Sequence, residues 1–391
     1  YPRDGGDYEY LKRAFGPWCG FLFAWAQLTT VVSGNIAIMA YAFVDYGLRL
    51  WPALAQYSIW LVIAPVIALS VLNALGVMAG KFTQNILTAA KIIGLAALML
   101  AGLWAGGTKP TVAANVDGAS ASRIGLALVF VLYAYGGWSH AAFVAAEVRD
   151  QRCSLPKALV FGIAGITLIY FAVNGSYLLA LGFDGARATQ TPAADVMAQA
   201  FGPIGGRAIS LLVMLSALGA INGMILTATR VYATWGADYP ALSWLSTWNR
   251  GVVAPIAAIA IQAAIAVLLI LIVGTALGQN SFDTALRSVG LRGLPWKEYN
   301  GGFEMLVASS TPVYWTLSLM TGLAVFVLRA KDVASERPFK IPLFPVPAIL
   351  FCATCAYMLY SSAAYARWLV LLAVVPLIIG GALTMIMRRG A

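Results

Sequence analysis

Leu128-Val-Phe-Val-Leu-Tyr-Ala-Tyr-Gly-Gly-Trp-Ser-His-Ala-Ala-Phe-Val-Ala-Ala-Glu147 is an apolar stretch long enough to span a bilayer, yet it is interrupted at its centre. Tyr133 and Tyr135 precede the adjacent glycines Gly136 and Gly137. Each glycine costs about 1 kcal/mol relative to alanine in a helix interior and permits backbone conformations that other residues resist. Irregular backbone at membrane depth is tolerated only inside protein or beside a water-filled cavity. The stretch therefore predicts a broken spanning helix, a feature of substrate sites in secondary transporters.

The composition indicates that most of the chain lies in a membrane. Of 391 residues, 61% are hydrophobic and only 10% are charged. A helix of about 20 apolar residues is sufficient to cross a bilayer, and such segments follow one another along the sequence. We predict an all-α polytopic membrane protein with one transmembrane domain over residues 1–391. About ten spans are expected, at 18–44, 57–78, 83–105, 124–147, 158–182, 207–233, 253–275, 305–328, 343–362 and 368–386.

The net charge of +10 invites a nucleic-acid-binding interpretation. The basic residues, however, lie in short loops between apolar spans, where they set orientation by the positive-inside rule. Lys and Arg are more frequent on the side that carries both ends of the chain. We therefore expect no nucleic-acid partner. We expect a multi-pass protein of the cytoplasmic (inner) membrane, surrounded by lipid, with both ends of this chain in the cytoplasm.

The side chains offer little for metal or cofactor chemistry. The chain has four cysteines and one histidine, and it shows no zinc-protease, nucleophile-elbow or phosphate-loop motif. We expect no cofactor, no metal site and no enzymatic activity. A long loop at about 276–302 is expected on the exterior side, as a solvated connector or as a cover over the outer mouth. A short interfacial helix is expected within residues 1–17.

Four stretches occur in a fixed order along the chain. They are Tyr1-Pro-Arg-Asp-Gly-Gly-Asp-Tyr-Glu-Tyr-Leu-Lys-Arg-Ala-Phe-Gly-Pro17 followed by Gly34-Asn-Ile-Ala37, Tyr133-Ala-Tyr-Gly-Gly-Trp138 with Glu147-Val-Arg-Asp150 and Leu155-Pro-Lys-Ala158, Gly219-Ala-Ile-Asn-Gly-Met-Ile-Leu-Thr-Ala-Thr-Arg230, and Glu336-Arg-Pro-Phe-Lys340. Together they resemble the amino acid–polyamine–organocation (APC) family of secondary transporters. The resemblance runs the whole length of the chain.

The resemblance implies an inverted-repeat bundle of the APC (LeuT-like) type. The family has twelve helices, and the first carries a glycine-rich break that nothing here matches. The ten spans are then expected to correspond to helices three to twelve, so the bundle is expected to lack helices 1 and 2. The broken span at 124–147 corresponds to helix six, whose symmetry partner in the repeat is helix one. Since the chain starts at Tyr1 rather than Met, both a fragment and a naturally truncated protein remain open.

The glycine break is the first candidate for substrate binding. If the helix unwinds at Gly136 and Gly137, free N–H and C=O groups would bind the zwitterionic head of an amino acid. The following half-helix would favour the carboxylate at its N-terminus. The alternative is close helix packing by small residues. By the resemblance, an aromatic at Tyr133 closes over substrate. Tyr135 flanks the same break, and an ordinary core role is the alternative for both tyrosines.

Other positions match the family's pocket. On the span 18–44 the matching residues are Gln27, Thr30, Asn35 and Ile38, and helical spacing would place Gln27, Thr30, Gly34 and Ile38 on one face. On the span 207–233 they are Asn222 and Met224. For these two residues the alternatives are polar helix–helix bonding and core filling.

Lys91 lies well inside an apolar span, and an intramembrane charge is a candidate functional group. The family carries a lysine at this place, and in some proton-coupled members it occupies the position of a sodium ion. We expect Lys91 to couple transport to protons; the alternative is a lysine that snorkels to the interface. At the cytoplasmic end, Glu147 and Arg230 would form a salt-bridged gate, with Arg230 alternatively a determinant of topology.

These features predict secondary active transport of an amino acid by alternating access, through proton symport or exchange. Polyamine or organic-cation transport is the alternative within the class. The spans 18–44 and 124–147 carry no carboxylate near their centres, which favours a substrate without excess positive charge. A transport-inactive membrane sensor or scaffold is the alternative from another class. The sequence makes no prediction about oligomeric state.

Overall fold

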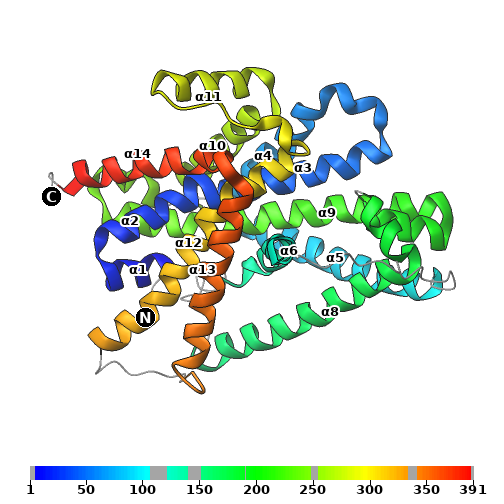
Figure 1. The fold of residues 1–391 in the computed structure, drawn as a ribbon, viewed down its shortest axis with the longest axis horizontal. Coiled ribbons are helices and arrows are strands. Elements are labelled where there is room, and N and C mark those ends of the chain that lie inside the picture. Colours follow the sequence, from blue (N-terminus) through cyan, green and yellow to red (C-terminus); the bar gives the residue numbers. More distant parts are fainter. Residues whose placement is uncertain are drawn as a thin grey trace.

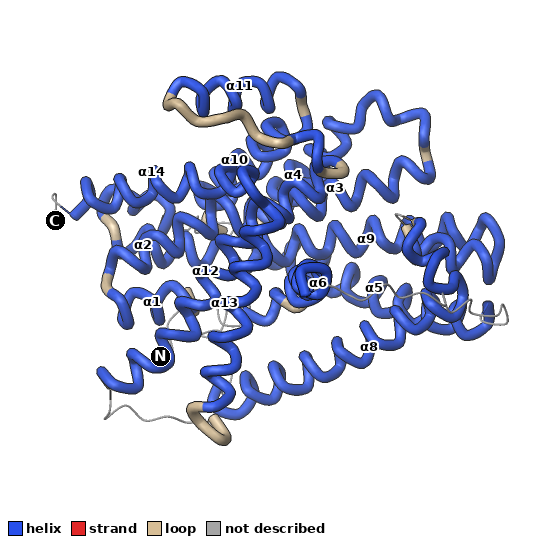
Figure 2. The backbone as a smooth tube through the Cα atoms, in the orientation of Figure 1, coloured by secondary structure: helices blue, strands red, loops and turns tan. Residues whose placement is uncertain are grey.

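The computed structural model describes residues 5–105, 121–139, 151–189, 191–247, 254–332 and 341–388, and every structural statement below concerns these residues. Figure 2 shows helices joined by turns and short loops. The α-helices are α1 (Asp7–Phe15), α2 (Pro17–Ala26), α3 (Val32–Leu50), α4 (Ser58–Ala74), α5 (Val77–Ala105), α6 (Ala121–Ala134), α8 (Gln151–Ala188), α9 (Pro192–Asp238), α10 (Ile256–Gly274), α11 (Ala276–Ser288), α12 (Gly301–Lys331), α13 (Val346–Ala366) and α14 (Leu371–Arg388). Shorter elements are the π-helical turn η1 (Gln27–Val31) and the 3₁₀ turns η2 (Pro52–Tyr57), η3 (Gly136–Ser139), η5 (Pro240–Ser246), η6 (Trp296–Glu298) and η7 (Arg367–Val370).

Eight helical stretches in the described residues are long and apolar enough to cross a membrane. The last stretch, Val346–Ile386, covers two of the predicted spans, and the predicted span 124–147 is described to residue 139, as α6 and η3. The chain is therefore an all-α polytopic membrane protein. The eight stretches are Pro17–Leu50, Pro52–Ala74, Gln84–Ala105, Cys153–Ala188, Pro192–Asp238, Ile256–Gly274, Gly301–Lys331 and Val346–Ile386.

The helix that contains η1 lies at the centre of the bundle. In the apolar window of Pro17–Leu50, 83% of the residues are buried inside the protein. In the corresponding window of Cys153–Ala188, only 6% are buried. Helix α3 packs against α4, α9, α10 and α12, and these elements share one large apolar core. Helix α8 exposes large apolar side chains such as Phe161 and Phe171, a face suited to lipid. Figure 1 shows α1 and the C-terminus at one end of the long axis, and the adjoining ends of α8 and α9 at the other.

Several helices are longer than the predicted spans. Helix α8 extends to Ala188 past Gly182, and α9 begins at Pro192, before Gly202. Both glycines have a φ of 68°, a left-handed conformation that glycine adopts without the steric cost of a Cβ atom. The predicted end of one span at 182 and the predicted start of the next at 207 therefore lie at or near kinks. The chain turns there and continues as helix.

The segment 276–302 contains a largely exposed helix, which its polarity did not indicate. Its first part forms α11, whose N-cap is Thr275: the side chain accepts a hydrogen bond from the Gly278 N–H at 2.9 Å. Such a cap satisfies one of the N–H groups left free at the start of a helix. Asp283 then accepts hydrogen bonds from the Leu294 N–H (2.9 Å) and the Trp296 indole (3.1 Å), which closes the segment on itself.

The first helix, α1, matches the short helix expected in residues 1–17 and is tied to the end of α9. The Tyr8 hydroxyl donates to Asp238 at 2.7 Å, and the Lys12 ammonium lies 2.6 Å from the same carboxylate. Lys331, at the end of α12, donates to the Ala14 carbonyl at 2.8 Å. Asp7 begins α1 and is only 8% exposed. This burial raises the pKa of its carboxyl from 3.8 to about 7, because removal from water disfavours the charged form.

We predict that Asp7 makes the stability of the protein depend on pH. Because the pKa is raised on folding, the folded state binds the proton more tightly. The stability contributed by this group is therefore fully present below about pH 4 and is lost as the pH rises through about 7. In thermal unfolding from pH 4 to pH 8, Asp7→Asn should lose this dependence and become the more stable protein at pH 8. As a control, Glu298→Gln removes an exposed carboxylate and should keep the wild-type dependence of stability on pH. Parallel profiles for wild type and Asp7→Asn would contradict the prediction.

Candidate functional site

The first half of the predicted broken helix can be compared with the structure, whereas its continuation over 140–150 lies outside the described residues. Helix α6 ends at Ala134, Tyr135 forms a turn, and Gly136–Ser139 form the 3₁₀ turn η3. The Tyr135 N–H donates to the Leu132 carbonyl at 3.1 Å, which is the shorter hydrogen-bonding pattern of a 3₁₀ turn. The α-helical hydrogen-bonding pattern therefore stops directly before Gly136.

Tyr133 connects the end of α6 to two other helices. Its hydroxyl donates to the Asn35 Oδ1 on α3, and the Ser310 side chain on α12 interacts with the same hydroxyl. Its ring meets the ring of Tyr314 on α12 edge to face, with centroids 5.6 Å apart. Edge-to-face packing of this kind stabilises aromatic pairs beyond their buried area. The predicted residues Tyr133 and Asn35 are thus brought together.

The two glycines of the break differ in their surroundings. A Cβ atom on Gly136 would lie 2.7 Å from the Tyr314 hydroxyl, whereas a Cβ atom on Gly137 would have no neighbour within 4 Å. Gly136 therefore permits a close approach between η3 and α12. Tyr135 turns to another neighbour, because its ring packs edge to face on Tyr170 of α8 with centroids 5.2 Å apart.

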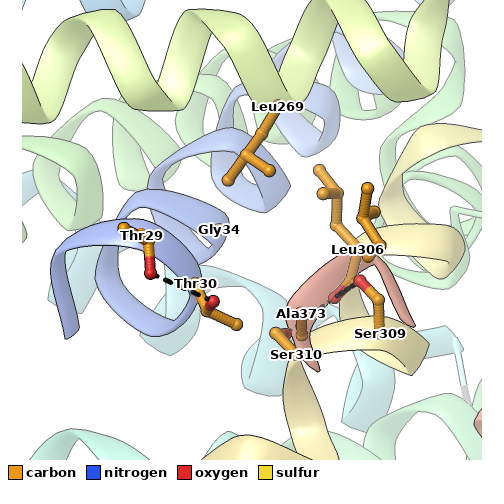
Figure 3. A pocket seen from close by; sticks show the side chains of 9 residues that line it. Thr29, Thr30, Gly34, Leu269, Leu306, Ser309, Ser310 and Ala373 are labelled. Carbon is orange, nitrogen blue, oxygen red and sulfur yellow. Dashed lines mark hydrogen bonds between the residues drawn. The ribbon is translucent and has the colours of Figure 1, made fainter. Parts of the chain in front are cut away.

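A small cavity (Figure 3) is lined in part by Ser310, the α12 residue whose side chain interacts with the Tyr133 hydroxyl. Its volume is about 10 Å³, close to the space that one water molecule requires. Hydroxyl groups face it from two sides, since Thr29 and Thr30 come from η1 while Ser309 and Ser310 come from α12 (Figure 3). The remaining lining residues are Gly34, Leu269, Leu306, Leu372 and Ala373.

The hydroxyls at this cavity are held by backbone carbonyls of their own helices. Thr29 donates to the Trp25 carbonyl at 2.8 Å, and Ser309 and Ser310 both donate to the Leu306 carbonyl, at 3.2 and 2.7 Å. A hydroxyl that donates in this way keeps its lone pairs. The cavity therefore offers acceptors for a small polar group. None of the residues that line it is charged.

The span 18–44 contains a π-helical turn that the predicted helical face did not include. At its end the Val32 N–H bonds to the Gln27 carbonyl, five residues back instead of four. A π turn shifts the side chains that follow it around the helix axis, and such turns are frequent at functional sites. Thr30 and Gly34 line the cavity, and Gln27 and Ile38 are buried. A common face for all four residues stays a prediction.

Asn222 and Met224 do not lie at this cavity. The Asn222 Oδ1 accepts a hydrogen bond from Asn73 on α4 at 2.8 Å, and its Nδ2 donates to Gln84 on α5 at 3.1 Å. Met224 packs partly buried against the main apolar core. The structure places Asn222 where α4, α5 and α9 meet, in the helix–helix role that was its alternative.

Lys91 lines a second and larger cavity of about 250 Å³. Tyr46, Tyr177 and Ser216 line it too, with apolar side chains of α5 and α9. Within the described part of the chain Lys91 makes no ion pair. A half-buried ammonium group beside a cavity in a spanning helix is a candidate for binding a carboxylate or exchanging a proton.

The expected gate pair is only half described. Arg230 is 9% exposed, and its guanidinium donates to the Leu226 carbonyl one turn earlier on α9. Glu147 lies outside the described residues. Within the described ranges, no group of three or more His, Cys, Asp and Glu side chains is placed to hold a metal ion.

Tyr314 and Ser310 on α12 were not predicted as site residues. A usable signal was present, because Ser309-Ser310-Thr311-Pro312 interrupts an apolar span. Proline removes a backbone hydrogen bond, and serine or threonine hydroxyls that bond back to the preceding turn bend helices. Thr311 donates in this way to the Val307 carbonyl at 2.5 Å. Helix α12 nevertheless continues through this segment as α-helix, with Pro312 inside it.

Comparison with known families matches residues 1–385 to the amino acid permeases. The chain belongs to the amino acid permease family, within the APC transporters. The serine/threonine exchanger SteT of Bacillus subtilis is 28% identical to this permease over 368 residues, which cover 92% of the permease and 76% of the relative.

Two further relatives are also amino acid transporters. The b(0,+)-type amino acid transporter 1 of Homo sapiens is 27% identical over 362 residues, 89% of the permease and 67% of the relative. The large neutral amino acids transporter small subunit 2 of Homo sapiens is 29% identical over 249 residues, 59% of the permease and 45% of the relative. The family and these relatives are transporters rather than enzymes.

The unequal surroundings of the two glycines give a test of the break. Gly136→Ala should destabilise the permease by about 1–3 kcal/mol, the usual effect of overpacking, because the new methyl group meets the Tyr314 hydroxyl. Gly137→Ala is the matched control and should be tolerated. Thermal unfolding of the purified variants measures both effects. Adding Tyr314→Phe should recover much of the loss in Gly136→Ala, and equal losses for the two glycine variants would show that this contact is unimportant.

Proposed function

We propose that this permease moves a small neutral amino acid across the cytoplasmic membrane by alternating access, in exchange for a second amino acid. The observation that carries the proposal is the end of α6. There an α-helix stops at Ala134, Tyr133 in its last turn contacts Asn35 on α3 and Tyr314 on α12, and Gly136 in the following turn approaches Tyr314. Interrupted helices supply unpaired N–H and C=O groups to substrates in transporters of this architecture.

The small volume of the cavity indicates that helices must move before a substrate can bind. A cavity of about 10 Å³ beside Tyr133 admits water but no amino acid. The Tyr133 side chain meets both α3 and α12. Separation of α6 from these helices would therefore release the Asn35 amide for a substrate. Tyr133 would then act as the side chain that covers the bound amino acid.

The charge of the site favours a neutral amino acid over a polyamine. A polyamine carries several positive charges, and burying them without carboxylates would be costly. No Asp or Glu lines the described cavity beside Tyr133. Exchange is favoured over other modes because one relative is named a serine/threonine exchanger. We place both ends of this chain in the cytoplasm, as the distribution of basic residues indicates.

Exchange can be tested in proteoliposomes with the protein expressed from its complete gene. Uptake of labelled serine should require unlabelled serine or another neutral amino acid inside the vesicles. Tyr133→Phe removes one hydrogen bond and should raise the KM by about tenfold, since leaving a buried polar group unpaired costs roughly 1–3 kcal/mol. Tyr135→Phe is the control and should retain the wild-type KM.

The outcomes separate the alternatives. Uptake that does not depend on internal amino acid would exclude exchange. Uptake of spermidine but not of neutral amino acids would favour the polyamine alternative. Lack of uptake for every compound, with a folded protein, would favour a sensor or scaffold. An unchanged KM in Tyr133→Phe would remove Tyr133 from the substrate site.

Proton symport is the second candidate mode, and Lys91 supports it. An intramembrane lysine beside a cavity of about 250 Å³ has room for water and hence a route for protons. Lys91→Ala should abolish the stimulation of uptake by a pH gradient while serine binding, measured by thermal shift, persists. Unchanged stimulation in Lys91→Ala would refute a coupling role for this lysine.

A further inference from the structure

Three amide side chains meet at the contact of α4, α5 and α9. Asn73 donates through its Nδ2 to the Leu69 carbonyl and to the Asn222 Oδ1, both at 2.8 Å. Asn222 donates in turn to the Gln84 Oε1 at 3.1 Å. Asn73 and Asn222 are 2% and 0% exposed. These bonds form a continuous polar seam through an apolar region of the bundle.

One atom of this seam lacks a protein donor. The Asn73 Oδ1 is buried, and within the described residues it accepts no hydrogen bond. Both Nδ2 hydrogens are already used, so turning the amide over would break two good bonds to satisfy one acceptor. Buried polar atoms are nearly always paired with protein or with ordered water. The unpaired oxygen therefore points to a ligand.

A cavity adjoins this side chain. It has a volume of about 10 Å³ and is lined by Asn73, by Thr229 and Arg230 of α9, and by Ala254 and Pro255 at the entry to α10, with apolar side chains around them. The volume is near the lower limit for one water molecule. It is too small for an amino acid or another organic ligand.

The polar groups around the cavity match a water molecule. The Thr229 hydroxyl donates to the Ile225 carbonyl at 2.9 Å and keeps its lone pairs. The Asn73 Oδ1 is likewise an acceptor, whereas the Arg230 guanidinium offers donors. A cation would meet the positive charge of Arg230, and an anion would meet the two oxygen acceptors. Water can donate to both oxygens and accept from the guanidinium.

We propose that an ordered water molecule occupies this cavity and bridges Asn73, Thr229 and Arg230. The water completes a polar seam that runs from Arg230 through Asn73 and Asn222 to Gln84. The seam ties α9, α4 and α5 together at the entry to α10. Gln84 lies about two helical turns before Lys91 on α5, so the bridge also fixes the position of the helix that carries this lysine. The inference does not depend on the transported substrate.

Direct observation is the first test. A crystallographic or cryo-electron microscopy map that resolves other buried waters should show a peak within hydrogen-bonding distance of the Asn73 Oδ1. A map of that quality without such a peak would overturn the proposal.

Two substitutions at Ala254, which is fully buried and lines the cavity, provide a second test. Ala254→Ser introduces a hydroxyl that replaces the water as a donor to Asn73, so the melting temperature should stay within about a degree of wild type. Ala254→Val displaces the water with methyl groups and leaves the Asn73 Oδ1 unpaired, so the melting temperature should fall by several degrees. Equal losses in both variants would contradict the proposal.

A double substitution separates the loss of water from simple overpacking. In an Asn73→Leu background the unpaired oxygen no longer exists, so adding Ala254→Val should cost much less than it costs in the wild type. The same cost in both backgrounds would assign the effect to crowding and overturn the proposal. If Asn73→Leu does not fold, the map decides the question by itself.

Discussion

Inside a bilayer every backbone N–H and C=O group must find its partner within the protein. This constraint accounts for the arrangement of the permease. Most of the described chain satisfies it as regular helix. The π turn η1 lies within the most buried span, with Trp25 just before it donating to the Pro376 carbonyl on α14 at 2.6 Å. At the end of α6, Tyr133 contacts α3 and α12, whereas Ala134 and Gly137 are exposed.

Many polar contacts in the interior are made by hydroxyl and amide side chains. Thr29, Ser309 and Ser310 bond back to carbonyls of the preceding turn, so their hydrogens are satisfied without a partner helix. The described salt bridges lie in α1, in loops and at helix ends, as in Arg49 with Asp195 and Arg367 with Glu298. Neutral polar groups cost less to bury than charges. The interior thus remains able to bind a net-neutral molecule.

The cavity lined by Ser310 and the cavity lined by Lys91 differ in their chemical groups. The first, between η1 and α12, is lined by uncharged hydrogen-bond acceptors, and the second, which is larger, is lined by a single ammonium group. They are lined by different residues, although α3 contributes to both, through Gly34 and Tyr46. The seam of Asn73, Asn222 and Gln84 joins α9 to α5. Through α9, which packs on α3, the Lys91 helix is connected to the helix that bears Asn35.

Sequence alone determined the apolar spans, the break at Gly136 and the family, because hydropathy, glycine propensity and ordered motifs are local properties of the chain. It also placed Tyr133 and Asn35 as candidates, although it did not show that they touch. The helical content of 276–302 was missed, since a Thr275 cap and a polar helix resemble a loop in composition. The tertiary structure decided the π turn, the role of Asn222 and the participation of Tyr314. These depend on which distant helix lies opposite each residue: a hydrogen bond such as that from Asn73 to Asn222 joins positions far apart in the chain. The choice between a π turn and an α turn involves too small a free-energy difference for local sequence to settle it against packing.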